Sequence, residues 1–566
     1  MSRSVAFPAT APQRGSRTEP ESGAHPHLRV GLLLNSLEQP RWVHELIRGL
    51  QELAAIRMAV VFLGSIPGSG SGEKDRGWSR LAYRLYDRFD RWKFLEAPDL
   101  LQSGDVSKLI QEWPVQELEL LSKPGGAGFS EEASRQVLER QLDVLLFAGD
   151  KGFWGEIPRL AKYGLWAFRF GSSQPAAFWE VVEGIPVVPS GLYICSDQEG
   201  AERQIYGSVA PSDAHSPSLA ANHLHGKTAL FAVRKLEQLH AIGEEALDPA
   251  RCLLPEPVPV PRGSGIPDNL TVTRAFSRLM ARFVKDVYHY RVDRKVRWDL
   301  AFRFGGDRLD RDELQVITPP EDRFWADPFP WQWGDRYYIF FEELLYSEEK
   351  GRLRAMEVRR DGSSGEPVTV LERDYHLSYP FLFRWQGELY MLPETMANRT
   401  IELYRCVSFP NRWELCKVLM EGVKAVDATL LERGGRWWMF VSLGLESVDA
   451  WDEVSLFHAD TPLGPWHPHP CNPVRSDVRA ARPAGALFEH RGRLYRPAQD
   501  CSVCYGHALS INEIRHLDRD SYEEVEVMRI QPRPELGELG IHTVNQAGDL
   551  VVFDRYASEA KSGRLP

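Results

Sequence analysis

Five segments in the second half of the chain share one pattern, and this repetition restricts the possible fold more than any other feature. Each segment reads as a strand, a turn that contains glycine, and a second strand that is usually aromatic. Glycine supplies the positive φ angle that a tight hairpin needs. The segments begin roughly 50–60 residues apart, which is the size of a four-stranded propeller blade. The repeated segments are 326–342, 378–394, 426–442, 483–499 and 541–556.

Five such repeats predict a five-bladed β-propeller, whereas a β-sandwich, the alternative for a chain of short strands, does not repeat in this way. The chain has 566 residues, and single hydrophobic cores stop growing at roughly 250–300 residues. Two domains are therefore expected. The predicted organisation is a disordered tail (1–27), an α/β domain (28–247), a proline-rich linker with a basic helix (248–297) and the propeller (298–560).

The part of the chain ahead of the repeats alternates strand and helix patterns. Segments 28–35 and 57–64 are short apolar runs typical of buried strands, and 40–53 between them has apolar residues at helical spacing. A later buried strand, 142–149, ends in glycine, where open α/β sheets bind ligands. This order and spacing predict a parallel, Rossmann-like α/β sheet.

Charge and cysteine content argue against several classes of protein. The net charge is −11, whereas a nucleic-acid-binding protein usually presents a basic face. The seven cysteines are odd in number and scattered, which disfavours a secreted disulfide framework and favours a reducing, cytoplasmic compartment. The single C-x-x-C at Cys501 and Cys504 lacks a second ligand pair, so no metal site is predicted. Residues 1–27 contain no apolar signal core and no long apolar run occurs, so neither a targeting peptide nor a membrane-spanning helix is expected.

The repeats place acidic side chains at matching positions near the expected propeller axis. Asp327 and Asp427 occupy the same position in the first and third repeats, Tyr379 occupies it in the second, and Glu394 follows Tyr379 by fifteen residues. Because the innermost strand of every blade faces the axis, these side chains are expected to converge. Paired carboxylates serve glycoside chemistry as acid and base or nucleophile, although acids at strand ends also cap turns or face solvent. The candidate catalytic residues are Asp327, Asp427 and Glu394, and the candidate substrate-binding residues are Trp325, Tyr379, Arg482 and His542.

The first repeat resembles a known family of sugar-active propellers. Residues 326–329, followed by 337–341, are similar to the opening blade of the arabinanase and β-xylosidase propellers. The resemblance implies that Asp327 is a general base, that Asp427 orients it and tunes it, and that a glutamate in the fourth blade is the general acid. In the fourth blade this chain has Arg482-Pro483 and then Gln499-Asp500 instead of a clear glutamate, which counts against hydrolysis.

A second resemblance covers nearly the whole propeller. Residues 476–485, 494–501, 505–506 and 511–514 are similar to the propeller domain named for plant glucosamine inositolphosphorylceramide transferase. In those plant proteins a separate glycosyltransferase domain is the expected catalyst, and the sequence shows no recognisable counterpart. The resemblance supports a carbohydrate or sugar-lipid partner more than it supports catalysis.

The N-terminal part resembles formyltransferase N-terminal domains. The similarity is carried by 142–149, 163–171 and 175–182, and it extends over about 28–207. It implies a catalytic asparagine, a histidine two residues further on, and a later aspartate, which together polarise the formyl carbonyl and move a proton.

The catalytic positions of that family are changed in this chain. Aligned on Tyr163-Gly164, the asparagine falls on Ala167 and the histidine on Arg169, while Asp197 is a nearby but unconvincing candidate for the aspartate. Alanine has no hydrogen-bonding side chain, and arginine does not exchange its proton near neutral pH. We therefore expect a degenerate domain that transfers no formyl group and needs no cofactor.

A basic stretch leads into the propeller. Residues 274–297 contain eight basic and two acidic side chains, and Phe276, Leu279, Phe283 and Val287 recur at helical spacing. Such a helix suits an anionic membrane surface, where each basic residue contributes on the order of 1 kcal/mol. It equally suits packing between domains, because it follows a linker and precedes the propeller.

Three functions remain open from the sequence. The first is a sugar-active enzyme that transfers or hydrolyses glycosyl groups with the propeller carboxylates Asp327 and Asp427. The second is a glycan-binding or scaffolding protein, which the absent fourth-blade glutamate favours. The third is a sugar N-formyltransferase, which Ala167 and Arg169 disfavour.

Overall fold

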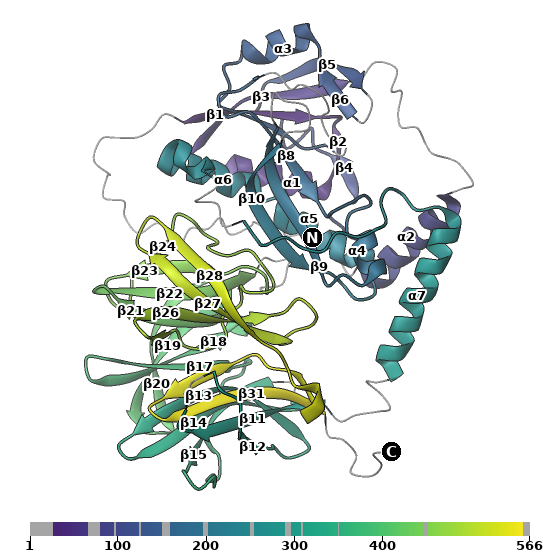
Figure 1. The fold of residues 1–566 in the computed structure, drawn as a ribbon. Helices are drawn as coiled ribbons and strands as arrows, with labels where there is room; N and C mark the ends of the chain where they lie inside the picture. The colour runs from purple at the N-terminus through teal and green to yellow at the C-terminus, as the bar shows by residue number, and fades with distance from the viewer. Residues whose placement is uncertain are drawn as a thin grey trace. The chain divides into compact units, whose positions relative to one another are not determined.

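The computed structural model describes residues 27–65, 80–95, 98–123, 126–149, 159–195, 202–248, 254–288, 296–306, 309–348, 350–444 and 451–558. The chain divides into two compact units, an α/β unit over residues 1–284 and a β-propeller unit over 285–566 (Figure 1). Most of the predicted disordered tail, residues 1–26, lies outside the described residues.

The α/β unit is built on an eight-stranded mixed sheet in the order β10-β9-β8-β7-β1-β3-β5-β6. The middle strands β8, β7, β1, β3 and β5 are parallel, as the sequence predicts, and antiparallel strands flank them at both edges. Because both faces are covered, the central strands β1 and β7 are mainly apolar: β1 contributes Val30 and Leu32 to one core and Leu33 to the other. The strands are β1 (Leu28–Leu34), β3 (Ile56–Ser65), β5 (Val115–Lys123), β6 (Gly126–Phe129), β7 (Val144–Phe147), β8 (Leu165–Phe170), β9 (Val187–Cys195) and β10 (Glu202–Pro211), with a separate pair β2 (Glu38–Pro40) and β4 (Ser103–Asp105).

Helix α1 packs on the sheet with the apolar face that its sequence displays. In α1 the buried residues recur at helical spacing, from Trp42 through Leu46 to Leu50, because side chains three and four residues apart share a face. The helix α5 begins at a cap in which the Ser216 side chain accepts from the Leu219 backbone N–H. The helices are α1 (Arg41–Glu52), α2 (Leu81–Phe94), α3 (Glu131–Leu138), α4 (Phe178–Glu183), α5 (Pro217–Thr228), α6 (Phe231–Ile242) and α7 (Asn269–Tyr288), with a 3₁₀ turn at Gly243–Leu247.

The described part of the predicted linker, residues 254–268, contains no helix or strand. It nevertheless packs against the α/β unit. Trp179 donates its indole N–H to the carbonyl of Gly265 (2.9 Å), and Glu183 accepts from the backbone N–H groups of Arg262 and Gly263 (2.9 and 2.8 Å). This stretch is therefore an extended part of the α/β unit, and α7 follows it.

The propeller has five blades, which confirms the prediction from the repeats. The first four blades are antiparallel sheets of four strands, each built from consecutive strands. The bounds are β13 (Arg323–Trp333), β14 (Arg336–Leu345), β15 (Lys350–Val358), β16 (Val368–Leu371), β17 (Ser378–Trp385), β18 (Glu388–Thr395), β19 (Thr400–Ser408), β20 (Arg412–Glu421), β21 (Lys424–Arg433), β22 (Arg436–Gly444), β23 (Ser455–Ala459), β24 (His467–Pro468), β25 (Phe488–His490), β26 (Arg493–Asp500), β27 (Ala508–Leu517) and β28 (Tyr522–Ile530).

The fifth blade joins the two ends of the propeller. Its inner strands β30 (Val544–Ala547) and β31 (Leu550–Ser558) come from the fifth repeat, together with the short β29 (Glu538–Gly540). Its outer strands β11 (Val296–Phe304) and β12 (Gln315–Ile317) precede the first repeat, and β11 pairs with β31 along its whole length. Backbone hydrogen bonds thus close the ring, so that neither end of the repeat array leaves an unpaired edge there.

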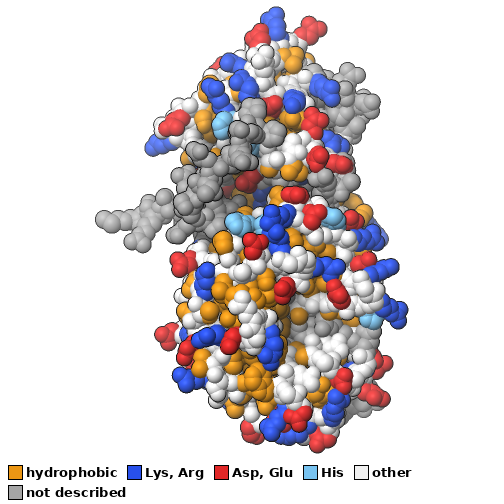
Figure 2. Space-filling view, turned by 90° about the vertical axis from the view of Figure 1, so that its left-hand side faces the viewer, with side chains coloured by type: hydrophobic (Ala, Val, Ile, Leu, Met, Phe, Trp, Pro, Cys, Tyr) orange, Lys and Arg blue, Asp and Glu red, His pale blue; other side chains and the backbone are white. Residues whose placement is uncertain are grey.

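Aromatic side chains fill the space between neighbouring blades. Phe329 of the first blade packs edge-on against Tyr379 and Phe381 of the second, with ring centroids 4.8 and 5.9 Å apart, and Phe383 continues the contact to Trp437 of the third blade at 5.3 Å. On the face shown in Figure 2, charged side chains of both signs are mixed with hydrophobic ones and do not separate into a basic patch. Within the described ranges, no helix is both long enough and apolar enough to span a bilayer.

Candidate functional site

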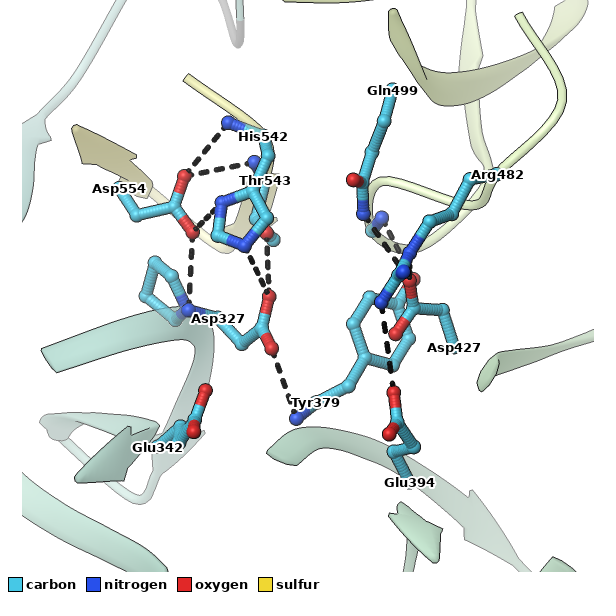
Figure 3. A network of polar contacts seen from close by, with 12 residues as sticks. Asp327, Glu342, Tyr379, Glu394, Asp427, Arg482, Gln499, His542, Thr543 and Asp554 are labelled. Carbon is cyan, nitrogen blue, oxygen red and sulfur yellow. Dashed lines mark hydrogen bonds and ion pairs between the residues drawn. The ribbon is translucent and has the colours of Figure 1, made fainter. Parts of the chain in front are cut away.

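Three inner strands of the propeller carry the same backbone distortion where their side chains meet the axis. In β13, β17 and β21 the pairing register shifts, and Asp327, Tyr379 and Asp427 at these bulges have φ angles of 52°, 45° and 56°. Left-handed backbone costs a residue other than glycine on the order of 1–3 kcal/mol, and β-bulges re-aim side chains beside functional sites. The repeat position that the sequence singles out is therefore a strained one that turns three side chains into one cluster (Figure 3).

Asp327 is held by groups from the second and fifth blades. Its carboxylate accepts hydrogen bonds from the Thr543 hydroxyl (2.9 Å) and the Tyr379 backbone N–H (3.2 Å), and its Oδ1 lies 3.4 Å from Nε2 of His542. Burial raises the pKa of Asp327 to about 6; the neighbouring carboxylate of Asp427 adds to the rise, and His542 opposes it.

His542 links Asp327 to a second buried carboxylate, that of Asp554. Nδ1 of His542 lies 2.6 Å from Oδ2 of Asp554, and Asp554 also accepts the backbone N–H groups of Asp327, His542 and Thr543 at 2.9–3.1 Å. Burial works against the charged imidazole, but the carboxylates of Asp554 and Asp327 outweigh it and raise the pKa of His542. Ligand atoms of Asp327, His542 and Asp554 lie within 4.8 Å of one another, a spacing that a metal ion could bridge.

Asp427 is paired with a buried arginine from the fourth blade. Arg482 donates from Nε to Asp427 Oδ2 at 2.5 Å, and its terminal nitrogen lies 3.7 Å from Glu394 Oε2. The guanidinium also lies over the ring of Tyr505, 4.8 Å from its centroid, and Gln499 donates to Asp427 at 3.2 Å. Burial disfavours the charge of Arg482, but the carboxylate of Asp427 outweighs it and raises the pKa of Arg482. Asp427 therefore has a full counter-charge inside the protein.

Two glutamates complete the acidic cluster. Glu342 and Glu394 occupy one repeat position on β14 and β18, which Ser442 and Gln499 hold in the third and fourth repeats. Burial raises the pKa of Glu342 and of Glu394 well above the usual range, and the surrounding carboxylates reinforce the shift. Both glutamates therefore favour the protonated, uncharged form. The hydroxyl of Ser442 is buried, and no described residue forms a hydrogen bond with it.

Tyr379 lies between Asp327 and the inner strand that carries Asp427, and it forms hydrogen bonds in both directions. Besides the hydrogen bond from its backbone N–H to Asp327, its hydroxyl lies 2.8 Å from Thr429 Oγ1 and accepts from the backbone N–H of Gly485 at 2.8 Å. On the opposite flank, the ring of His542 contacts those of Trp298 and Tyr505, with centroids 4.1 and 5.4 Å apart. Hydrogen-bonding groups beside aromatic rings are a common lining of small-molecule sites.

The cluster is closed in this structure. Arg482 and Glu394 are each 7% exposed, and Asp427 is 1% exposed. Six of the seven candidates from the sequence meet here. They are Asp327, Tyr379, Glu394, Asp427, Arg482 and His542.

The seventh candidate, Trp325, has different surroundings. Its indole N–H donates to Glu343 at 3.0 Å, and its ring packs 5.1 Å from that of Phe341 in the core. The sequence analysis missed Glu342, although a signal existed, because Glu342 follows the first-repeat aspartate by the same fifteen residues that separate Tyr379 and Glu394. It also missed Asp554, whose repeat aligns weakly with the others.

The altered formyltransferase positions line a separate cavity in the α/β unit. Ala167 and Arg169 lie on β8, and the cavity beside them has a volume of about 360 Å³. Arg169 forms an ion pair with Glu202. Asp197 lies outside the described residues. The resemblance of this part to formyltransferases stays a prediction.

The sequence of the propeller is similar to that of a known protein family. Residues 316–539 match the family model described as glucosamine inositolphosphorylceramide transferase 1, N-terminal. Glucosamine inositolphosphorylceramide transferase 1 of Oryza sativa subsp. japonica is 37% identical over 222 residues, which cover 38% of this chain and 30% of the relative. The protein of the same name from Arabidopsis thaliana is 36% identical over 211 residues, which cover 36% of this chain and 27% of the relative. The match thus spans less than a third of either relative.

Solved structures with some likeness to the chain include carbohydrate-active enzymes. Zg3597, a family 117 glycoside hydrolase from Zobellia galactanivorans, aligns with a TM-score of 0.30 and 13% identity over 47% of this chain and 91% of that one. The catalytic domain of the Coprinopsis cinerea GH62 α-L-arabinofuranosidase aligns with a TM-score of 0.33 and 10% identity over 48% and 100%. The fold assignment itself rests on the strand order of the five blades.

Proposed function

We propose that this protein acts in glycan or glycolipid metabolism and that the cluster at the propeller axis receives a sugar and transfers or hydrolyses a glycosyl group. The match of residues 316–539 to a domain named for a glucosamine inositolphosphorylceramide transferase supports the substrate class. The cytoplasmic side of a membrane is the proposed location.

The observation that carries the catalytic proposal is that Asp327, Asp427 and Glu394 meet in one buried cluster at the axis. Burial makes Glu394 favour the protonated form, whereas Asp327, with a pKa of about 6, is largely ionised at neutral pH. Glycosyl chemistry needs one protonated and one ionised carboxyl group. Glu394 would give its proton to the departing oxygen as the glycosidic bond breaks, and Asp327 would take a proton from the water or hydroxyl that forms the new bond.

A second candidate function is glycan binding without turnover. The specific observation in its favour is the Arg482–Asp427 ion pair, which places a cation in the blade where the resembled hydrolases have an acid. An arginine and an amide, from Gln499, bind hydroxyl groups well but do not donate protons near neutral pH.

Matched neutral variants distinguish the two functions. The wild type, Asp327→Asn and Glu394→Gln are assayed with 4-nitrophenyl glycosides, and with sugar nucleotides plus inositolphosphorylceramide vesicles, with the exposed Glu489→Gln as control. The catalytic proposal expects turnover that falls by about 100-fold or more in both axial variants, because general acid–base groups contribute that much, and that persists in the control. Calorimetric binding without turnover establishes the second function instead. If neither binding nor turnover occurs, the axis is not a sugar site.

We also propose that the protein contacts an anionic membrane through α2 and α7. Phe276 of α7 lies 6.4 Å from Phe89 of α2, and Phe89 lies 6.2 Å from Trp92, ring centroid to ring centroid. All three are exposed, Trp92 by 77%. Contiguous exposed apolar surface of this kind marks an interaction site. Leu85 of α2 and Met280 of α7 extend it.

Charge favours a membrane as the occupant of this apolar surface. Helix α2 carries four basic and two acidic side chains, and α7 carries four basic and one acidic. This local excess of positive charge contrasts with the net charge of −11 for the whole chain. Basic residues beside exposed Trp, Phe and Leu are typical of helices that lie in an anionic lipid interface. The basic residues of 289–295 lie outside the described residues.

Vesicle co-sedimentation tests the membrane proposal. We expect the protein to bind vesicles that contain anionic lipid, to release them as salt rises, and to lose binding in the double variant Phe89→Ser/Trp92→Ser. Trp333→Ser, at an exposed tryptophan of the β13–β14 hairpin, is the matched control and should bind normally. Equal binding by both variants would show that the patch is not the membrane contact. A monomer–dimer change without vesicle binding would show that a second protein surface covers the patch.

A further inference from the structure

The cavity of the α/β unit has the position and size of a ligand site. It lies where the parallel neighbours β7 and β8 end, and open α/β sheets bind their ligands beyond the carboxyl ends of the strands. Its volume is about 360 Å³, and small-molecule sites occupy roughly 300–1,000 Å³. The other walls come from α2, α5 and the loop residues 171–176.

The loop 171–177 is held in a defined conformation against the cavity. Glu180, which is fully buried, accepts the backbone N–H of Ser172 at 2.7 Å. Ala177, also fully buried, adopts a left-handed φ of 63° at the end of the loop, and Gly171 has a φ of 73° at its beginning. A left-handed alanine is strained, and such strain persists where the surrounding structure imposes it, often beside ligands.

Aromatic rings form most of the apolar wall. Tyr83 and Phe178 meet edge to face with centroids 5.6 Å apart, and Phe170 stacks on His225 at 4.1 Å with the rings 12° from parallel. Burial lowers the pKa of His225 to about 4, so its imidazole is neutral at physiological pH. Nδ1 of His225 bonds the carbonyl of Ala221 at 2.7 Å, which leaves Nε2 as an acceptor when Nδ1 carries the proton.

The charged side chains that line the cavity are paired within the protein. Arg91 forms ion pairs with Asp87 and Asp99, each at 3.0 Å, and Arg169 pairs with Glu202. A charged ligand would therefore lose its hydration without gaining a free counter-charge from these groups, and that loss is costly in an enclosed site.

We propose that this cavity binds an uncharged, planar small molecule with an aromatic or heteroaromatic ring. The ring lies among Tyr83, Phe170 and Phe178, and a donor on the ligand meets the neutral imidazole of His225. The proposal is independent of the sugar site in the propeller, because it rests on residues of the α/β unit alone.

Two fluorescent probes of nearly the same skeleton test the proposal on the full-length protein. N-phenyl-1-naphthylamine is neutral, and 1-anilinonaphthalene-8-sulfonate adds a fixed negative charge. We expect the neutral probe to bind saturably with one site per chain and the sulfonate to bind at least about tenfold more weakly, which corresponds to about 1.4 kcal/mol. No saturable binding of the neutral probe, or equal binding of the sulfonate, overturns the proposal.

Cavity-filling variants locate the bound probe. Ala221→Phe fills the cavity from α5, and Ala176→Phe fills its rim on the half-buried loop; far-UV circular dichroism checks that each is folded. Either folded variant should bind the neutral probe with an affinity lower by about tenfold or more. The variant Phe89→Ser/Trp92→Ser, which changes the exposed surface of α2, should bind as the wild type does. If the filled variants bind normally, or if the surface variant alone loses the probe, the cavity is not the site.

Discussion

Asp327 and Asp427 occupy the same repeat position in two blades, with the same bulge and almost the same left-handed φ angle, yet their surroundings differ. Asp427 meets a permanent cation, Arg482, and an amide. Asp327 meets a hydroxyl, a backbone N–H and a histidine that is itself shared with Asp554. Internal symmetry thus places equivalent acids at the axis, while neighbours that break the symmetry give each acid different partners.

The difference has its origin in the fourth and fifth blades. In the fourth blade the inner strand β25 has three residues, and Arg482 lies ahead of it in a segment joined to β26 by the isolated Pro483–Ala498 bridge. In the fifth blade the chain ahead of β30 places His542 and Thr543 around Asp554 instead. These two irregular segments supply the residues that make the surroundings of Asp427 and Asp327 differ.

The largest expected effect is on stability, and it comes from removing Arg482, the partner of Asp427. Arg482→Met leaves Asp427 buried beside Glu394 without a cation, so we expect a loss of about 3–5 kcal/mol in the free energy of unfolding at pH 7. Chemical denaturation measures it. Adding Asp427→Asn should recover a large part of the loss, because the uncompensated charge is then gone. A single variant as stable as the wild type would mean that Asp427 is not held by its ion pair.

Substitution of His542, the partner of Asp327, should lower the stability less, and the loss should depend on pH. His542→Asn removes a side chain that contacts Asp327 and Asp554, and we expect a loss of about 1–3 kcal/mol at pH 6. Because the folded protein raises the pKa of His542, its charged form stabilises the fold fully below the unfolded-state pKa of about 6.5. That contribution is lost as pH rises through the folded-state pKa. The difference between variant and wild type should therefore shrink toward pH 9, and a difference independent of pH would contradict this account.

The smallest expected effect concerns Glu342, the buried glutamate that is a partner of neither Asp327 nor Asp427. Glu342 has a raised pKa, so its burial costs stability once the pH exceeds the unfolded value near 4.5. Glu342→Gln should stabilise the protein at pH 8 by about 1.4 kcal/mol for each pKa unit of the shift that is realised and change little at pH 4.5. Thermal unfolding at both pH values measures this, with the exposed Glu489→Gln as control. Destabilisation at pH 8 would show that the charged form is needed.

Much of the fold followed from patterns that are local in the sequence. Five strand–turn–strand repeats predict five blades, and the alternation of Leu-rich strands with the amphipathic segment 40–53 predicts the parallel sheet of the α/β unit. Closure of the propeller by β11 and β31 was not predicted, because the pairing joins segments about 250 residues apart and β11 has no counterpart in the repeat pattern. The packing of the proline-rich stretch 254–268 on the α/β unit escaped prediction for a similar reason: its contacts are made by single backbone groups.

The candidate site, like the fold, was predicted only in part from the sequence. The sequence alone determined that Asp327, Tyr379 and Asp427 occupy one repeat position, since repeat symmetry carries positions from blade to blade. Only the tertiary structure decided that Arg482 pairs with Asp427 and that His542 joins Asp327 to Asp554. It also decided which carboxyl groups favour their protons. The physical reason is that charge state depends on burial and on partners within a few ångströms, and both arise only when distant segments meet at the axis.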